Sequence, residues 1–477
     1  MKIHHFTKKT HLSVPVETAF AWHERPGAID RLTPPWEEIQ IISQAGGIEA
    51  GAQTYFKVKA GPVWLKWLAH HMLYEKNKMF QDIQRHGPFL FWEHNHQFEP
   101  DGTHACFLTD SIRFRLPFTP LSDVFALKTV KKRLYRMFEY RHAVTQHDLK
   151  LLANYQDNQK IVITGASGVL GAALVPFLRT QGHSVTRIVR QTPQLEDEAF
   201  WNPYRQEIDT NAFENADTVI HLAGEYIGDG RWTKKKKKRI IDSRVKGTQM
   251  IAETISNMKS PPKTLICASA IGYYGNRGIE TITEASTPGN DFISDVCTQW
   301  ENAAAAAIDK GIRVIFLRIG IVLTPRGGAL ERLLPLYKTG LGMILGDGAQ
   351  MMSWISEDDF LGVVNHVIHN PTISGPVNVT SPNPVSQQNF SNILAQSLAR
   401  PAFIHLPQWI ITPLFGQMGN EVLLAGNCVI PEKLMVSNYS FLHPKLEDAL
   451  QHLLGLYTFD PVAASQFETI RGKGIRP

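Results

Sequence analysis

Hydrophobic and polar positions follow two different rhythms along the chain. In the first part, residues 111–116 alternate polar with apolar side chains, the period of a half-buried strand, and 54–59 and 89–92 are further strand-like runs. Asp101-Gly102 lies between two such runs and is typical of a hairpin turn. Residues 121–152 contain no glycine or proline and carry apolar side chains at helical spacing. This part therefore predicts strands followed by one long amphipathic helix.

From Lys160 onward, short apolar strands alternate with helix-like segments. A helix-like stretch spans about 169–180, and this alternation is typical of a parallel, doubly wound sheet. The strand-like runs are 161–163, 184–189, 218–222, 264–267 and 313–317. The polar segment 154–159 predicts a linker. We therefore expect one domain over 1–153, a second over 160–455, and a tail over 456–477.

A glycine-rich turn follows the first strand of the second part and opens a helix. Its glycines have the spacing GxxGxxG, which allows a tight turn, close approach of a pyrophosphate, and close packing of helix on strand. The phosphate would lie on the helix N-terminus. A turn without a ligand is the alternative, and the strand–turn–helix context disfavours it. The predicted cofactor-binding residues here are Gly165, Ser167, Gly168, Val169, Leu170 and Gly171.

The end of the second strand predicts which dinucleotide is bound. An acidic residue there would hold the ribose hydroxyls of NAD, but the chain offers Arg187 and Arg190 and no acid until Glu196. A guanidinium suits a 2′-phosphate, so NADP is expected. Arg190, at the end of the strand, is the better candidate; the alternative is that both arginines are solvated.

The composition excludes several classes of protein. Hydrophobic residues are 43% of the 477 and charged residues 19%, which argues against a disordered chain. The chain contains no run of about 18 uncharged apolar residues, so no membrane-spanning helix is predicted. The first residues are not followed by an apolar segment, so no secretory signal is predicted. The four cysteines form no CxxC pair. We therefore expect a cytoplasmic protein.

The positive net charge is concentrated in one place. The net charge is +5, and residues 234–239 are six consecutive basic residues, so no nucleic-acid-binding face is expected. We interpret the lysines as a solvated helix face; binding to an anionic membrane or polyphosphate is the alternative.

Several motifs together resemble the extended short-chain dehydrogenase/reductase superfamily, and more narrowly its atypical branch labelled "epimerase family protein". They are 164–171, His221-Leu222-Ala223-Gly224, 269–275 and 354–359, with support from 231–233, 243–248, 299–301 and 418–454. The resemblance covers about residues 160–455. It implies a Rossmann domain with a small C-terminal substrate lobe, and NADP bound along the strand ends beside Leu222, Ala223 and Gly224.

The first 150 residues resemble the START-like (SRPBCC) helix-grip fold. Residues 13–22 look like its first strand-to-helix turn, and the hairpin and the long terminal helix fit as well. The resemblance implies an α+β domain with an apolar ligand between a curved sheet and the helix. An ordinary packed interior without a ligand is the alternative, because an aromatic lining and an aromatic core look alike in sequence.

The Tyr-x-x-x-Lys pair that performs acid–base chemistry in the superfamily is missing. Phe292 or Ile293 occupies the tyrosine position, and Val296 or Cys297 the lysine position. The serine position falls at Ser269 or Ala270. The remaining catalytic candidates are Ser269, Tyr273, Tyr274 and Glu225. For the two tyrosines, a packing role is an equal alternative, and for Glu225 the alternative is a solvated acid in a loop. Cys297 is expected to be a buried, inert thiol.

A pair of histidines is the one further constellation with chemical interest. His94 and His96 are two apart on a predicted strand and so share a face. They could ligate zinc with His70, His71 or His104, but spacing fixes no third ligand. We interpret them as polar strand-face residues and expect no metal.

Two hypotheses of different classes follow. The first is an NADP-dependent oxidoreductase or epimerase that acts on a small hydroxylated or carbonyl substrate, with a fused domain for an apolar ligand. The second is an NADP(H)-binding sensor or ligand-handling protein with little turnover. The intact cofactor motifs favour the first hypothesis, and the missing Tyr-x-x-x-Lys pair favours the second.

Overall fold

The computed structural model describes residues 2–118, 121–155 and 157–471, which form two compact units. The first unit combines residues 1–156 with 179–181 and 454–477, and the second combines 157–178 with 182–453. Residue 156 of the expected linker and residues 472–477 of the expected tail lie outside the described residues. Among the helices of the described part, none is long and apolar enough to cross a membrane.

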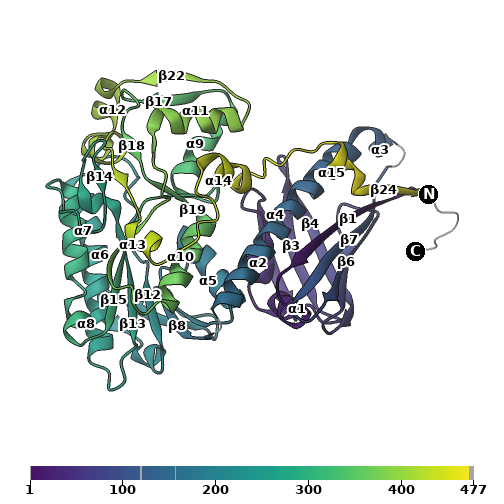
Figure 1. The fold of residues 1–477 in the computed structure, drawn as a ribbon, viewed down its shortest axis with the longest axis horizontal. Helices are drawn as coiled ribbons and strands as arrows, with labels where there is room; N and C mark the ends of the chain where they lie inside the picture. The colour runs from purple at the N-terminus through teal and green to yellow at the C-terminus, as the bar shows by residue number, and fades with distance from the viewer. Residues whose placement is uncertain (1, 119–120, 156, 472–477) are drawn as a thin grey trace. The chain divides into compact units, whose positions relative to one another are not determined.

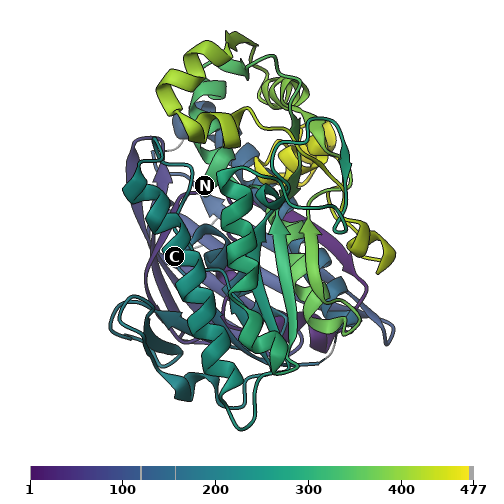
Figure 2. The same cartoon turned by 90° about the vertical axis from the view of Figure 1, so that its left-hand side faces the viewer.

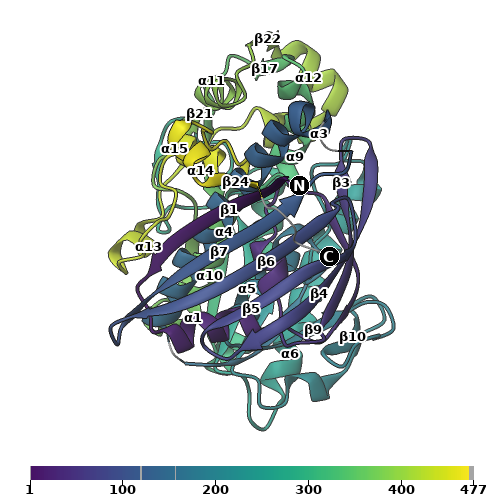
Figure 3. The same ribbon diagram turned by 90° about the vertical axis from the view of Figure 1, so that its right-hand side faces the viewer.

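The first unit is an antiparallel sheet with one long helix across it (Figures 1 and 3). The strands lie in the order β2-β3-β4-β5-β6-β7-β1-β24. They are β1 (Lys2–Leu12), β2 (Ile39–Ala45), β3 (Gln53–Ala60), β4 (Val63–Glu75), β5 (Met79–His86), β6 (Phe91–Asp101), β7 (Ala105–Arg115) and β24 (Phe467–Arg471). The helices are α1 (Val16–Glu24), α2 (Ala28–Leu32), α3 (Leu121–Phe125), α4 (Leu127–Asn154) and α15 (Pro461–Ser465).

The core of this unit follows the period-two pattern of its strands. Every second residue of β7 is buried, which confirms the alternation predicted from 111–116. The predicted hairpin at Asp101-Gly102 is also present, because Asp101 pairs with Ala105. The single helix expected over 121–152 is instead divided at Ala126, where φ is −101° and ψ is −26°. The Ala126 amide still donates to the Ser122 carbonyl at 2.8 Å, so the division is local.

The expected tail contributes a strand to the first sheet. β24 pairs antiparallel with β1, with Phe467 opposite Phe6, and the two ring centroids are 4.7 Å apart. The segment expected as a tail from 456 therefore carries helix α15 and strand β24 within residues 461–471. The physical reason is that β1 would otherwise present an unpaired edge of N–H and C=O groups.

The second unit is a doubly wound sheet, as predicted. Its strands lie in the order β11-β10-β9-β8-β12-β13-β15-β20, and all neighbours are parallel except β10 and β11. The strands are β8 (Lys160–Thr164), β9 (Ser184–Val189), β10 (Glu198–Asn202), β11 (Glu207–Ile208), β12 (Thr218–His221), β13 (Thr264–Ala270), β15 (Arg313–Ile319) and β20 (Gly375–Val379).

Helices cover both faces of this parallel sheet (Figures 1 and 2). On one face lie α6 (Lys234–Ser256), α7 (Phe292–Asn302) and α8 (Ala305–Asp309), and on the other α5 (Val169–Thr180) and α10 (Glu357–His369). The strand order reverses between β8 and β12. In open parallel sheets, ligands bind outside the carboxyl ends of the strands at such a reversal.

The later segments of the second unit form a smaller lobe. Its β17 (Gly342–Leu345) pairs in parallel with β22 (Ala402–Leu406), and α11 (Gln387–Ser397) packs against β17. The Ser391 hydroxyl of α11 donates to the Met343 carbonyl of β17 at 3.0 Å.

Candidate functional site

The glycine-rich turn has the geometry that its sequence predicts. Gly165 has φ of +76°, and a Cβ built there would lie 2.8 Å from the Ala223 backbone nitrogen. A Cβ built on Gly171 would lie 2.2 Å from the Gly165 carbonyl oxygen. Both positions therefore require glycine. α5 begins at Val169, and Ser167, Gly168 and Val169 are exposed at its N-terminus, where first-turn N–H groups lack helical partners.

The segment after β12 lies directly against this turn. The Leu222 amide donates to the Thr164 carbonyl at 3.2 Å, and the backbone of Leu222 and Ala223 lies against Gly165. Gly224 follows them at the strand ends, where open parallel sheets have their ligand-binding crevice. Below them, the His221 Nδ1 and the Thr164 hydroxyl are 2.6 Å apart. Burial lowers the pKa of His221 to about 4, so its imidazole is neutral at pH 7. This histidine joins β8 and β12 under the crevice without adding charge.

The two arginines of the second strand have different surroundings. Arg187 of β9 makes a bidentate pair with Asp197, at 2.7 and 2.8 Å. Arg190, just beyond the strand, is exposed, and among the described residues no acid pairs with it. Of these two guanidinium groups, the one of Arg190 therefore has no acidic partner among the described residues.

A buried polar network lies beneath the end of β13. The Glu301 carboxylate of α7 accepts two hydrogen bonds from Arg318 of β15, both at 2.9 Å, and one from the Ser269 hydroxyl at 2.7 Å. Arg318 also donates to the Tyr274 hydroxyl at 3.0 Å, and that hydroxyl donates to Asn378 at 2.6 Å. Burial raises the pKa of Tyr274. Ser269 and Tyr274 are thus tied into packing under the site.

Tyr273 differs from its neighbour in both exposure and bonding. It is half-buried in the 3₁₀ turn Ile271–Tyr274 that follows β13. The Arg318 guanidinium lies 3.4 Å from the centroid of the Tyr273 ring. Within the described residues, its hydroxyl has no hydrogen-bond partner, unlike the hydroxyl of Tyr274. Tyr273 is therefore the candidate whose phenol is free to exchange a proton.

Glu225 is held by the basic run at the start of α6. Its carboxylate lies 2.9 Å from the Lys236 ammonium and 3.2 Å from Arg239. The hydrogen bond from Lys236 is the main cause of its lowered pKa. The interpretation of the run as a solvated face fails for Lys236, whose side chain is only 11% exposed because it pairs with this acid.

The helix that carries the catalytic pair in ordinary superfamily members contains apolar residues here. α7 begins at Phe292, and Ile293, Val296 and Cys297 are buried on it. Cys297 is buried, as expected, and burial raises the pKa of its thiol to about 12, which argues against a nucleophile.

His94 and His96 lie together in the first unit, with neighbours that sequence reasoning missed. His94 lies between Asp82, at 3.3 Å, and Asp110, at 3.0 Å. His96 lies 2.6 Å from Asp110, and His142 of α4 lies 2.7 Å from the same Asp110 carboxylate. Burial lowers the pKa of His94 but the two carboxylates raise it, with a net rise to about 9. None of His70, His71 or His104 takes the third position; Asp82 does.

The sequence contained a partial signal for the residues that reasoning missed. Arg318 is a charge at the end of the apolar run of β15, and a charge within such a run requires a partner. The pairing of Arg318 with Glu301 could not be predicted, because the two residues are 17 positions apart and lie on different elements, β15 and α7.

A family model and solved structures match this chain. The model of the NAD dependent epimerase/dehydratase family matches residues 161–379, and the model of a domain of unknown function, DUF1731, matches 406–453. An epimerase family protein of Mycobacterium bovis is 38% identical over 293 residues, which are 61% of this chain and 97% of that protein.

Two crystal structures are similar over different lengths. The nucleoside-diphosphate sugar epimerase from Corynebacterium glutamicum has a TM-score of 0.78 and 33% identity, and the match covers 96% of this chain and 92% of that one. The human epimerase family protein, solved with NADPH, has a TM-score of 0.57 and 29% identity, and the match covers 62% of this chain and 98% of that one. The first match therefore extends over both units.

Proposed function

Because this chain belongs to the epimerase family, within the NAD dependent epimerases and dehydratases, we propose that it is an NADP(H)-dependent oxidoreductase or epimerase. Its substrate is a small hydroxylated or carbonyl compound held between the cofactor crevice and the C-terminal lobe. The observation that carries the proposal is the pair of close backbone approaches at Gly165 and Gly171 after β8. Arg190, which has no acidic partner among the described residues, follows the neighbouring strand β9.

NADP(H) is the cofactor that this crevice suits. The N-terminus of α5 would hold the pyrophosphate, because the N–H groups of the turn and the helix dipole favour an anion there. The guanidinium of Arg190 would hold the 2′-phosphate, because Arg187 is already paired with Asp197. The NADPH in the human relative supports this assignment.

We expect NADP(H) to bind at least about tenfold more tightly than NAD(H), a difference of roughly 1.4 kcal/mol. Arg190→Ala should remove most of that difference, because the 2′-phosphate loses its charged partner. Isothermal calorimetry with both cofactors measures it. Arg205→Ala removes another exposed arginine of the same unit and should change neither affinity. Equal affinities of the unmodified chain for the two cofactors would contradict the assignment.

Tyr273 is the proton donor of this proposal. Its hydroxyl has no partner within the described residues, whereas Ser269, Tyr274 and Glu225 each have one. Arg318 against its ring supplies the positive charge that the missing lysine supplies elsewhere in the superfamily. In this scheme Glu301 positions Arg318, Ser269 and Tyr274 belong to the packing beneath the site, and Glu225 orders the start of α6.

The test is oxidation of NADPH by the purified full chain in the presence of aldehydes, ketones and sugar nucleotides, followed by its absorbance. Sugar nucleotides are also followed by NMR, because epimerisation consumes no net cofactor. We expect turnover with at least one carbonyl class, and Arg190→Ala should raise the KM for NADPH, which a contaminating reductase would not show.

The second candidate function is an NADP(H)-binding sensor with little turnover. The observation that favours it is the apolar character of the start of α7, where the acid–base pair is expected and no tyrosine or lysine is present. Tight NADPH binding without turnover of any substrate would support it. Absence of NADPH binding would overturn both functions.

For the first unit we propose a START-like helix-grip domain. The antiparallel order of its strands and the position of α4 across them support this. An apolar ligand in such a domain would share the space under α4 with aromatic side chains, among them Phe138, and with the buried charges around Asp110.

A further inference from the structure

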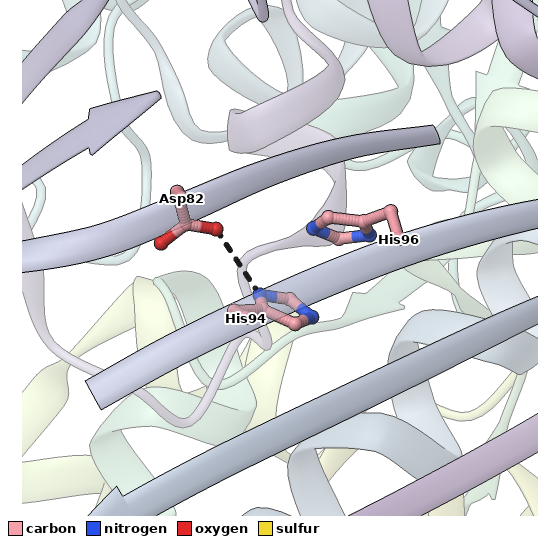
Figure 4. Close-up of side chains that lie close together, drawn as sticks. All are labelled: Asp82, His94 and His96. Atoms are coloured by element: carbon pink, nitrogen blue, oxygen red, sulfur yellow. Dashed lines mark ion pairs between the residues drawn. The ribbon is translucent and has the colours of Figure 1, made fainter. Parts of the chain in front are cut away.

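Three potential metal ligands converge on the inner face of the first sheet (Figure 4). Asp82 of β5 lies directly opposite His94 of β6, and His96 is two residues further along β6. One ligand atom from each residue lies within 4.8 Å of those of the other two. The antiparallel register therefore assembles a group that linear spacing does not reveal.

A second carboxylate orients both imidazoles of this group. Asp110 of β7 lies opposite His96 in the sheet. Its carboxylate accepts from the Nε2 of His94 at 3.0 Å and lies 2.6 Å from the Nδ1 of His96. Each ring therefore has one nitrogen at Asp110. The other nitrogen of His94, Nδ1, lies 3.3 Å from Asp82, so an ion between them would contact both. The other nitrogen of His96 is Nε2. Metal-binding histidines almost always have their second nitrogen at a carboxylate, a backbone carbonyl or water.

Asp110 is itself held in place. His142 of α4 lies 2.7 Å from its second oxygen, and the other nitrogen of His142 is 2.6 Å from the Thr10 hydroxyl. The side chain of Asp110 is 5% exposed and that of His94 6%, while Asp82 is 15% exposed. The group is thus held on the side of Asp110 and reaches solvent at Asp82 and at His96, whose side chain is 11% exposed.

We propose that Asp82, His94 and His96 form a binding site for a divalent transition-metal ion of the zinc class. Two imidazole nitrogens and one carboxylate oxygen suit Zn²⁺ and related ions, whereas Mg²⁺ and Ca²⁺ prefer oxygen ligands alone. Three protein ligands leave a coordination position for water or a ligand. This site is independent of the function proposed for the second unit.

The test uses the full chain after removal of metal with a chelator. Titration with Zn²⁺ by calorimetry should show one ion bound per chain, and Co²⁺ should give the visible absorption bands of a nitrogen- and oxygen-ligated ion. His96→Ala and Asp82→Asn should abolish this binding. Asp110→Asn, a positioning change, should lower the affinity by about 10–100-fold. His104→Ala removes an exposed histidine of the same unit and should leave Zn²⁺ binding unchanged.

Two results would overturn the site. The first is an unmodified chain that binds neither Zn²⁺ nor Co²⁺, a result that does not depend on the folding of any variant. The second is Zn²⁺ binding by Asp82→Asn and His96→Ala that equals that of the unmodified chain, which would assign the ion to other residues. Circular dichroism and NADPH binding confirm that each variant is folded.

Discussion

Tyr273→Phe is expected to lower turnover by about 10² to 10⁴-fold, the usual effect of losing a general acid. The variant keeps the ring that packs on Arg318, so NADPH affinity should stay nearly unchanged. Arg318 also explains why a tyrosine could work here without a lysine. Its guanidinium lies against the ring on which negative charge would develop when the proton leaves.

Tyr274→Phe is the matched control for this result. It removes a hydroxyl that bonds Asn378 and Arg318 in the buried network, and so it should lower stability while leaving the turnover of folded protein largely intact. Single-turnover kinetics with saturating NADPH measure both variants. If Tyr273→Phe retains full turnover, the donor is among Ser269, Tyr274 and Glu225.

Glu301→Ala is expected to lower the free energy of unfolding of the second unit by about 3–5 kcal/mol. The change leaves the Arg318 guanidinium, 4% exposed, without the carboxylate that accepts two of its hydrogen bonds. The cost comes from an uncompensated buried charge and not from the attraction itself, because replacing a whole buried pair is often nearly neutral.

Asp197→Ala provides the comparison. It breaks a bidentate pair with Arg187 of similar length, but those side chains are 22% and 29% exposed. The expected cost is at most about 1 kcal/mol, because water replaces the lost partner. Calorimetry measures both, and the transition of the second unit is the one that NADPH shifts upward. Equal destabilisation by the two changes would show that the network under β13 contributes no more than an exposed pair.

The second unit was predictable because local signals agree with one another. Apolar runs gave β8 and β9, and the spacing of Gly165 and Gly171 gave the turn and the start of α5. These features depend on residues within about 30 positions of each other. The network of Glu301, Arg318 and Asn378 was not predictable, because three separate elements must be packed before its members meet.

The histidine group of the first unit could also be predicted only in part. Alternation along β6 placed His94 and His96 on one face, as predicted. The choice of Asp82 as the third member depends on the register between β5 and β6, which a single sequence does not contain. Strand β24 was missed for a similar reason, because five residues near the end of the chain carry too little pattern to identify their pairing with β1.

The pairing of β24 with β1 sets an order for folding during translation. The ribosome makes β1 before β24, with residues 157–453 between the two portions of the first unit. At about 5–20 residues per second, the roughly 300 intervening residues take about 15–60 s. The second unit can therefore fold on the ribosome before the first sheet is complete. During that interval the outer edge of β1 is available to chaperones or to another nascent chain.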